Sequence, residues 1–116
     1  MTEKTIFARI IDGELDADIV YEDDHCIAIK DIAPKAPTHL LLIPREPIPR
    51  LVDAGEKHRD LLGHLMLAAS KVAQQAGIGD AFRLVVNNGE QVGQTVFHLH
   101  LHILGNKEFS EDKLDF

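Results

Sequence analysis

Hydrophobic and polar residues follow one another along the chain in patterns that predict regular elements. In TIFARIIDGE, apolar residues at 6, 7, 10 and 11 recur at helical spacing, with Thr5 placed to cap the helix and Gly13 to end it. The segments 18–21 and 26–30 alternate as strands do, on either side of an acidic turn. The nearly all-apolar THLLLIP predicts a strand that is covered on both faces and ends at Pro44.

The second half of the chain predicts a long helix followed by two strands. Asp53 and Glu56 have the spacing of a capping box at a helix start. A broad apolar stripe continues to Gly77, with Leu67 lying off it, through Leu61, Leu62, Leu65, Met66, Ala69, Val72, Ala73 and Ala76. FRLVVN and TVFHLHLHILG, joined by a turn that contains glycine, predict the last two strands.

The order of these elements predicts an α+β fold. About five strands, with two helices inserted between strand pairs, favour a mostly antiparallel sheet rather than a βαβ alternation. At 116 residues the chain is expected to form a single domain, 1–116, in which the polar residues 106–116 are a tail without regular structure.

Composition and charge limit the classes of function that we expect for this chain. The net charge of −7 and the absence of a basic run argue against nucleic acid as a partner, although a few local donors suffice to hold a small nucleotide. No segment has the apolar length of a membrane span or the pattern of a signal peptide, so we expect no membrane association and a cytoplasmic location. The single cysteine, Cys26, lies in an apolar alternation and is interpreted as a core thiol.

Three histidines occupy every second position of VGQTVFHLHLHILG, residues 92–105. In a strand, His98, His100 and His102 share one face, which we expect to be exposed or covered by polar groups. The opposite, core-facing positions are Phe97, Leu99, Leu101 and Ile103.

The histidine row has three interpretations. A shared metal ion is one, but about 13 Å of strand separates the first and third histidines, so one ion cannot take all three. Any further ligand would have to come from scattered residues such as His25, His39, His58 or His64. Three solvated histidines on an open sheet face are the second interpretation. The third is chemistry, because a neutral imidazole is both a nucleophile and a proton carrier.

The loop ahead of the histidines supports the chemical interpretation. Gly93 allows close approach to the backbone, and Gln94 and Thr95 offer N–H groups, an amide and a hydroxyl. Such donors suit the oxygens of a phosphate whose charge grows in a transition state.

GQTVFHLHLHILG resembles the signature of the histidine triad (HIT) family of nucleotide hydrolases and transferases. TIFARIIDGE, YEDDHCIAIKDIAPKAPTHLLLIPR and FRLVVNNG are also similar to stretches of its Hint branch, the purine nucleoside phosphoramidases. The resemblance covers residues 5–105 and implies the HIT-like fold, usually as a homodimer whose sheets join through the long helix and a strand edge. It implies no metal and no cofactor.

The resemblance implies catalytic roles for five residues. His100 would attack the α-phosphorus to form a covalent nucleotidyl-histidine that water then hydrolyses. His102 would lie beside the phosphate and the leaving group, and His98 with the distant His39 would support the nucleophile. Thr95, at a position that is commonly serine, would donate its hydroxyl toward the phosphate or the leaving group. From the residues alone, His39 could equally be a buried strand histidine.

The resemblance also implies a nucleotide site. Gly93, Gln94, Thr95 and Val96 would form the phosphate loop together with His100 and His102, and Asn87 would meet ribose or phosphate. Asp31 would accept the ribose hydroxyls. The purine would enter an apolar slot formed by Ile6, Phe7, Ile10, Ile29 and Ile32. From the residues alone, the slot positions could equally be ordinary core and Asn87 a turn residue.

The implied activity is hydrolysis of P–N or acyl-phosphate bonds of purine nucleoside monophosphate derivatives. The dinucleoside polyphosphate hydrolases of the same family are an alternative, as is a nucleotide-binding adaptor with little turnover. The transferase branch fits less well, because its third triad position is typically Gln and here it is His102. Lys30 stands where some relatives carry histidine, and the chain lacks the tryptophan found in the tail of others.

Overall fold

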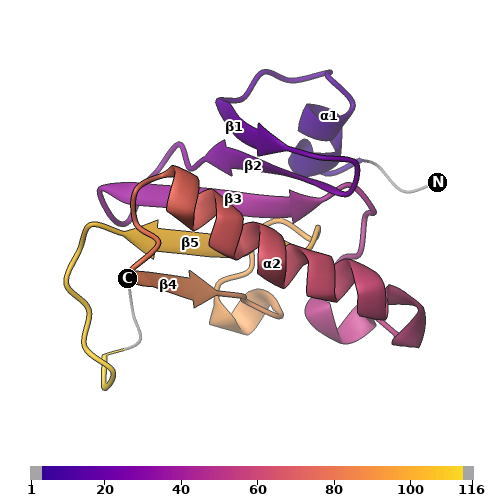
Figure 1. Ribbon diagram of the computed structural model, residues 1–116. Helices are drawn as coiled ribbons and strands as arrows, with labels where there is room; N and C mark the ends of the chain where they lie inside the picture. Colours follow the sequence, from indigo (N-terminus) through magenta and orange to yellow (C-terminus); the bar gives the residue numbers. More distant parts are fainter. Residues whose placement is uncertain (1–3, 114–116) are drawn as a thin grey trace.

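In the computed structural model, which describes residues 4–113, two helices flank a five-stranded sheet (Figure 1). The helices are α1 (Ile6–Ile11) and α2 (Arg59–Gln75), and the strands are β1 (Ile19–Glu22), β2 (Cys26–Lys30), β3 (Thr38–Pro44), β4 (Phe82–Val85) and β5 (Leu101–Gly105). The strand order is β1-β2-β3-β5-β4, and every neighbouring pair is antiparallel. The predicted α+β fold with an antiparallel sheet is therefore confirmed.

Helix α1 starts and ends as its sequence predicts. The Thr5 side chain accepts a hydrogen bond from the Ala8 backbone N–H at the first turn, and Gly13 takes a positive φ of 79° just beyond the last. Phe7 points into the sheet, and burying its ring contributes about 2 kcal/mol. It packs with Ile27, Ile29, Leu41 and Ile43.

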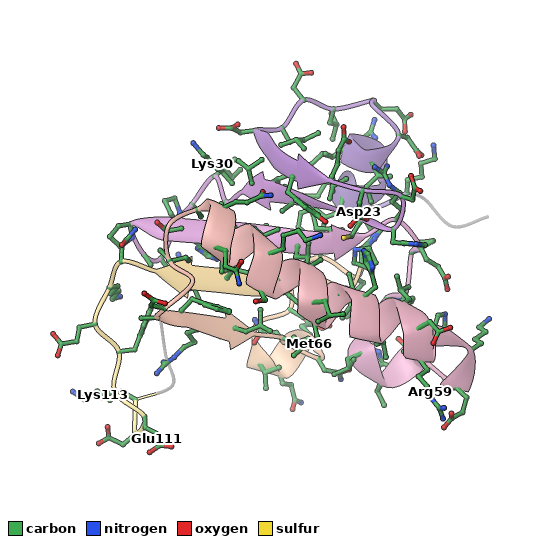
Figure 2. The ribbon with its side chains drawn as sticks, viewed as in Figure 1. Asp23, Lys30, Arg59, Met66, Glu111 and Lys113 are labelled. Carbon is green, nitrogen blue, oxygen red and sulfur yellow. The ribbon has the colours of Figure 1, made fainter. Side chains whose placement is uncertain are left out.

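Helix α2 covers the other face of the sheet, where it crosses in front of β3 and β5 (Figure 1). Its buried residues, Leu65, Ala68, Ala69, Val72 and Ala73, form the larger core together with alternate residues of the strands. Strand β3 is thus buried on both faces, as predicted. The prediction was wrong for Met66, labelled in Figure 2, which is 58% exposed.

The predicted capping box at Asp53 and Glu56 does not open the long helix. The segment forms two short 3-10 turns, Leu51–Asp53 and Glu56–His58, and α2 begins at Arg59. The Asp53 carboxylate accepts hydrogen bonds from the backbone N–H and the guanidinium of Arg50. These hydrogen bonds close the first turn locally. Asp53 and Glu56 therefore belong to a connector and not to the start of α2.

The final strand is shorter than predicted. Residues 95–100 lie outside the ladder, and β5 begins only at Leu101, opposite Leu42 of β3. Pro44 explains the difference, because proline has no N–H with which to continue a ladder toward the preceding residues. The chain instead turns so that the Leu99 N–H donates to the Ile48 carbonyl. The first four residues of FRLVVN, 82–85, form β4, whereas residues 86 and 87 do not.

The tail is held against β4 as far as the structure describes it. Arg83 donates to the carbonyls of Ser110 and Lys113, and its guanidinium lies 4.4 Å from the centre of the Phe109 ring. Figure 2 shows Glu111 and Lys113 below this edge of the sheet. Residues 106–113 form no helix or strand, as expected, although these contacts hold them against β4; residues 114–116 lie outside the described part.

Candidate active site

The histidines gather on the sheet face that carries α1. His102 of β5 pairs with Leu41 of β3, so both side chains lie on the same face, and His39 lies two residues before Leu41. His98 and His100 precede β5 and continue onto this face beneath Phe7. The structure thus brings all four predicted histidines together although His39 is far from the others in sequence.

His100 is held in one tautomer. Its Nδ1 lies 2.7 Å from the His98 backbone oxygen, which can only accept, so Nδ1 carries the proton and donates. The Phe7 ring meets the imidazole edge-on at 4.9 Å between centroids, and the residue is buried. Burial lowers the His100 pKa, so near neutral pH the ring is uncharged with a lone pair on Nε2.

His98 is fixed from both sides of its ring. Its Nε2 donates to the Pro44 carbonyl at 2.7 Å, and its Nδ1 lies 3.4 Å from the Thr5 hydroxyl. Burial lowers the pKa of this histidine too. The expected exposed or polar-covered histidine face is wrong here, because His98 is fully buried and Phe7 covers both this ring and that of His100. Conversely, Phe97, expected in the core, is 42% exposed.

His39 and His102 form a hydrogen-bonded pair. The Lys35 backbone N–H donates to His39 Nδ1 at 3.0 Å, so the His39 proton lies on Nε2, which is 2.9 Å from His102 Nδ1. His102 therefore accepts at Nδ1 and carries its own proton on Nε2. Burial, together with the neighbouring His100 and His39, lowers the His102 pKa to about 4. The ring centres of His100 and His102 are 5.1 Å apart.

Asp31 reaches this pair from the end of β2. One carboxylate oxygen accepts from the Ala33 N–H at 2.7 Å, and the other lies 3.4 Å from His39 Nε2. Burial lowers the His39 pKa, and the negative charge of Asp31 opposes this effect. Asp31 and His39 also line a recess of about 450 Å³, whose wall includes Leu40 of β3 and Val72 of α2.

The predicted phosphate loop, 93–96, directly follows a 3-10 turn at Glu90–Val92. Gly93 has φ of 101°, a left-handed conformation that strains any other residue. Thr95 is exposed to solvent, whereas Asn87 and Val96 are half-buried.

Gln94 does not present its amide outward as expected. The side chain is buried, donates to the carbonyls of Pro49 and Val96, and accepts from the Gly89 N–H. Its backbone N–H donates to the Gly89 carbonyl. Gln94 therefore braces the loop, and the hydroxyl of Thr95 is the accessible polar group of the pair.

The five predicted slot residues differ in burial. Phe7 and Ile29 are buried and belong to the core. Ile10 is half-buried, Ile6 is 50% exposed and Ile32 is fully exposed. Ile32 is therefore not a core residue.

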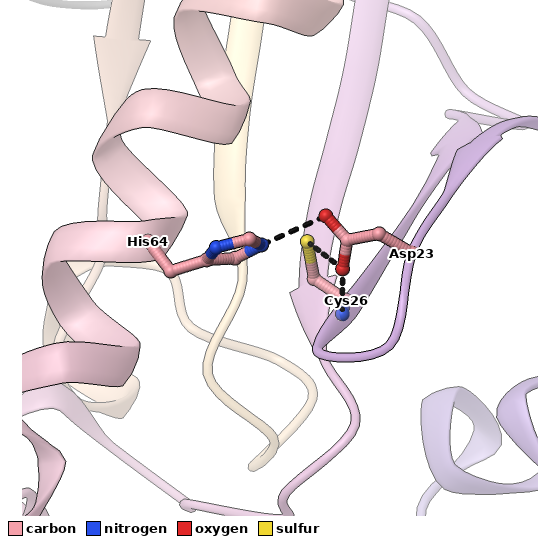
Figure 3. Close-up of side chains that lie close together, drawn as sticks. All are labelled: Asp23, Cys26 and His64. Atoms are coloured by element: carbon pink, nitrogen blue, oxygen red, sulfur yellow. Dashed lines mark hydrogen bonds and ion pairs between the residues drawn. The ribbon is translucent and has the colours of Figure 1, made fainter.

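Within residues 4–113, two groups of side chains could hold a metal ion. The first is Asp31, His39 and His102, within the site, and differs from the HxHxH chelate considered from sequence. The second is Asp23, Cys26 and His64, between the β1–β2 turn and α2 (Figure 3). There the Asp23 carboxylate accepts from His64 at 2.7 Å and from the Cys26 thiol at 3.5 Å. Burial raises the Cys26 pKa to about 12, which fits the predicted inert core thiol.

Sequence reasoning missed three groups that set the histidine geometry. Thr5 was expected only as a helix cap, and the Pro44 carbonyl and Lys35 N–H were not considered. Backbone groups leave no residue-type signal, and Thr5 lies 93 positions from the histidine that it contacts. Local pattern carries no information about such pairs.

Comparison with solved structures places this arrangement in a known class, the HIT hydrolase fold. A HIT family hydrolase of Legionella pneumophila superposes with a TM-score of 0.90 at 38% identity, covering 93% of this chain and 97% of that one. One from Clostridium thermocellum also gives 0.90, at 44% identity, with 95% and 96% covered.

Comparisons of the amino-acid sequence point to the same family as the solved structures. The HIT domain profile matches residues 12–109. A HIT-like protein of Synechocystis is 61% identical over 110 residues, 95% of this chain and 96% of its own. The purine nucleoside phosphoramidase of Escherichia coli K12 is 45% identical over 108 residues, 92% and 91% of the two chains. The chain therefore belongs to the HIT domain family and is an enzyme of the hydrolase class.

Proposed function

We propose that the protein hydrolyses P–N or acyl-phosphate bonds of purine nucleoside monophosphate derivatives, with His100 as the nucleophile. The observation that carries the proposal is the hydrogen bond from His100 Nδ1 to the His98 carbonyl, which leaves a lone pair on Nε2. The similarity to the E. coli purine nucleoside phosphoramidase supports the choice of substrate class.

In the proposed reaction, His100 Nε2 attacks the α-phosphorus and the P–N bond breaks. The leaving nitrogen takes a proton, for which the Nε2–H of His102 is the suited donor, since Nδ1 of that ring accepts from His39. Water then attacks the nucleotidyl-histidine and its proton returns to His102 Nε2, which releases the nucleoside monophosphate and restores neutral His100 and His102. The His39 Nε2–H donates to His102 Nδ1 and so stabilises the negative charge that develops on His102 as it gives up its proton.

The nucleotide would lie across the histidine face. We assign the exposed Ile32 and Ile6 with half-buried Ile10 to the purine, above the floor of Phe7 and Ile29. Asp31 would accept the ribose hydroxyls. Thr95, with the backbone of Gly93, Gln94 and Val96 and the side chain of Asn87, would surround the phosphate.

We further infer that the protein acts as a homodimer. Met66 and Leu67 are 58% and 75% exposed on α2, and they place adjacent apolar side chains on a helix that otherwise faces solvent there. Neither helix in the described range, 4–113, has the length and apolar character needed to cross a bilayer.

Intact mass spectrometry after acid quench tests the mechanism. Brief exposure to adenosine 5′-phosphoramidate is expected to add one adenylyl group to the protein, and His100→Ala is expected to show none and to lose turnover by at least about 10³-fold. His25→Ala, a histidine exchange at an exposed position outside the site, is the matched control. Undiminished turnover in His100→Ala would refute the proposal, and faster cleavage of a diadenosine polyphosphate would refute its substrate class.

A further inference from the structure

Thr5 uses one hydroxyl group for two contacts. As the cap of α1, its oxygen accepts a hydrogen bond from the Ala8 N–H at 3.1 Å. The same oxygen lies 3.4 Å from Nδ1 of His98, whose side chain belongs to the other end of the chain. Helix α1 is thereby connected directly to the histidine segment.

The direction of the second contact follows from the partners of His98. The Pro44 carbonyl can only accept, so the ring proton lies on Nε2 and Nδ1 holds a lone pair. A neutral His98 can therefore only accept at Nδ1. The Thr5 hydroxyl donates its single proton there, while its oxygen accepts from Ala8, so the geometry satisfies both groups at once.

The consequence for His100 runs through the His98 backbone. The His98 carbonyl accepts from His100 Nδ1 at 2.7 Å, so the position of residue 98 determines the orientation of the next imidazole. Because residues 95–100 lie outside the sheet ladder, these side-chain bonds replace the ladder in fixing the segment. Phe7, two residues after Thr5, contacts both rings.

We propose that Thr5 is a positioning residue for the nucleophile: its donated hydrogen bond fixes the ring of His98, and through the His98 carbonyl it fixes His100. This inference rests on the proposed function, in which His100 attacks phosphorus. It also connects substrate binding to chemistry, because α1 carries Ile6 and Ile10 of the proposed purine slot. Seating of the purine against α1 then stabilises the arrangement that orients His100.

Three substitutions separate the hydroxyl donor from the helix cap. Thr5→Ser keeps the donor and the cap. Thr5→Asp keeps the cap, since carboxylates cap helices well, but has no proton to donate at neutral pH. Thr5→Val preserves the shape and loses both. Thr38→Val is the matched control, because it removes a hydroxyl that accepts from Asn106 at a position outside the proposed machinery.

Turnover, KM and melting temperature are measured for each variant. We expect Thr5→Ser to retain kcat within about twofold, and Thr5→Asp and Thr5→Val to lose kcat by about tenfold or more with a smaller change in KM. Melting temperature should fall in Thr5→Val and hold in Thr5→Asp. A wild-type kcat in both Thr5→Asp and Thr5→Val would overturn the positioning role, as would a loss in Thr38→Val equal to theirs.

Nitrogen-15 NMR of the His98 ring provides a readout independent of activity. The wild-type and Thr5→Ser proteins should show a protonated Nε2 and a hydrogen-bonded, unprotonated Nδ1, and the Nδ1 signal should shift in Thr5→Val. An unchanged Nδ1 signal in Thr5→Val would contradict the contact. If the wild type shows this signature but forms no nucleotidyl adduct, the proposed reaction fails while the hydrogen bond stands; adduct formation at the wild-type rate in both donor-deficient variants refutes the positioning role alone.

Discussion

At the scale of single residues, the site depends on histidines that stay uncharged. Burial is the first cause of the lowered pKa in His98, His100 and His102 alike. An uncharged His100 keeps the Nε2 lone pair that the proposed attack needs. The sequence predicted which histidines lie together, but not their burial, because Phe7 covers them from the opposite end of the chain.

The pH dependence of turnover follows from the lowered pKa values of these histidines. Histidines are neutral above their pKa and gain a proton as pH falls through it, so lowered values move the loss of activity below the usual pH of about 6.5. We expect kcat/KM to be level from pH 7.5 to 6.5 and to fall only at more acidic pH. A rate profile measured with adenosine 5′-phosphoramidate in buffers of constant ionic strength checks this. An acid limb centred at or above pH 6.5 would contradict it.

At the scale of elements, local patterns predicted what local forces determine. The helix cap at Thr5, the strand at 26–30 and the covered strand that ends at Pro44 all follow from neighbouring residues. The start of α2 and the start of β5 were misplaced. A competing local turn decides where α2 begins. A partner distant along the chain decides where β5 begins, because the Leu99 N–H donates to the Ile48 carbonyl.

The contact between the β1–β2 turn and α2 shows how one side chain joins two elements (Figure 3). The Asp23 carboxylate accepts from the N–H groups of His25 and Cys26, from the Tyr21 hydroxyl and from His64. Burial alone would raise the Asp23 pKa, but these hydrogen bonds outweigh it and hold the pKa well below its usual range. Asp23 therefore stabilises the fold as a carboxylate.

Asp23→Asn is expected to lower the free energy of unfolding by about 2 kcal/mol at pH 7, because an amide has one acceptor oxygen where the carboxylate has two. Since the folded pKa is depressed, the stabilisation is present above about pH 4, where the unfolded carboxyl ionises, and it is lost as pH falls further. Urea denaturation at pH 7 and pH 3 measures both effects. The exposed Asp24→Asn is the control, and equal losses in the two variants would contradict the assignment.

At the scale of the whole molecule, the two faces of the sheet are covered by different elements. Helix α2 and the larger core stabilise one face, which leaves the other face for α1 and the histidines. Rigid strands thus fix His39 and His102, whereas side-chain hydrogen bonds fix His98 and His100. The core was predictable from hydrophobic periodicity. The division between binding and packing faces was not, because it depends on where the short helix docks.

The outer side of α2 carries the last prediction, which concerns assembly. Leu67 was the one apolar residue of this helix set apart from its core stripe, and in the structure it is 75% exposed beside Met66. If a second copy covers this surface, Leu67→Glu places a charge where water is excluded and should convert a dimer to a monomer. Gln74→Glu adds the same charge at another exposed position of α2 and should leave the dimer intact. Light scattering during size-exclusion chromatography at micromolar concentration distinguishes the two masses. A monomeric wild type, or a Leu67→Glu variant that remains dimeric, would show that this surface joins no second copy; a monomeric variant that still forms the His100 adduct would show that each protomer contains a complete nucleophile.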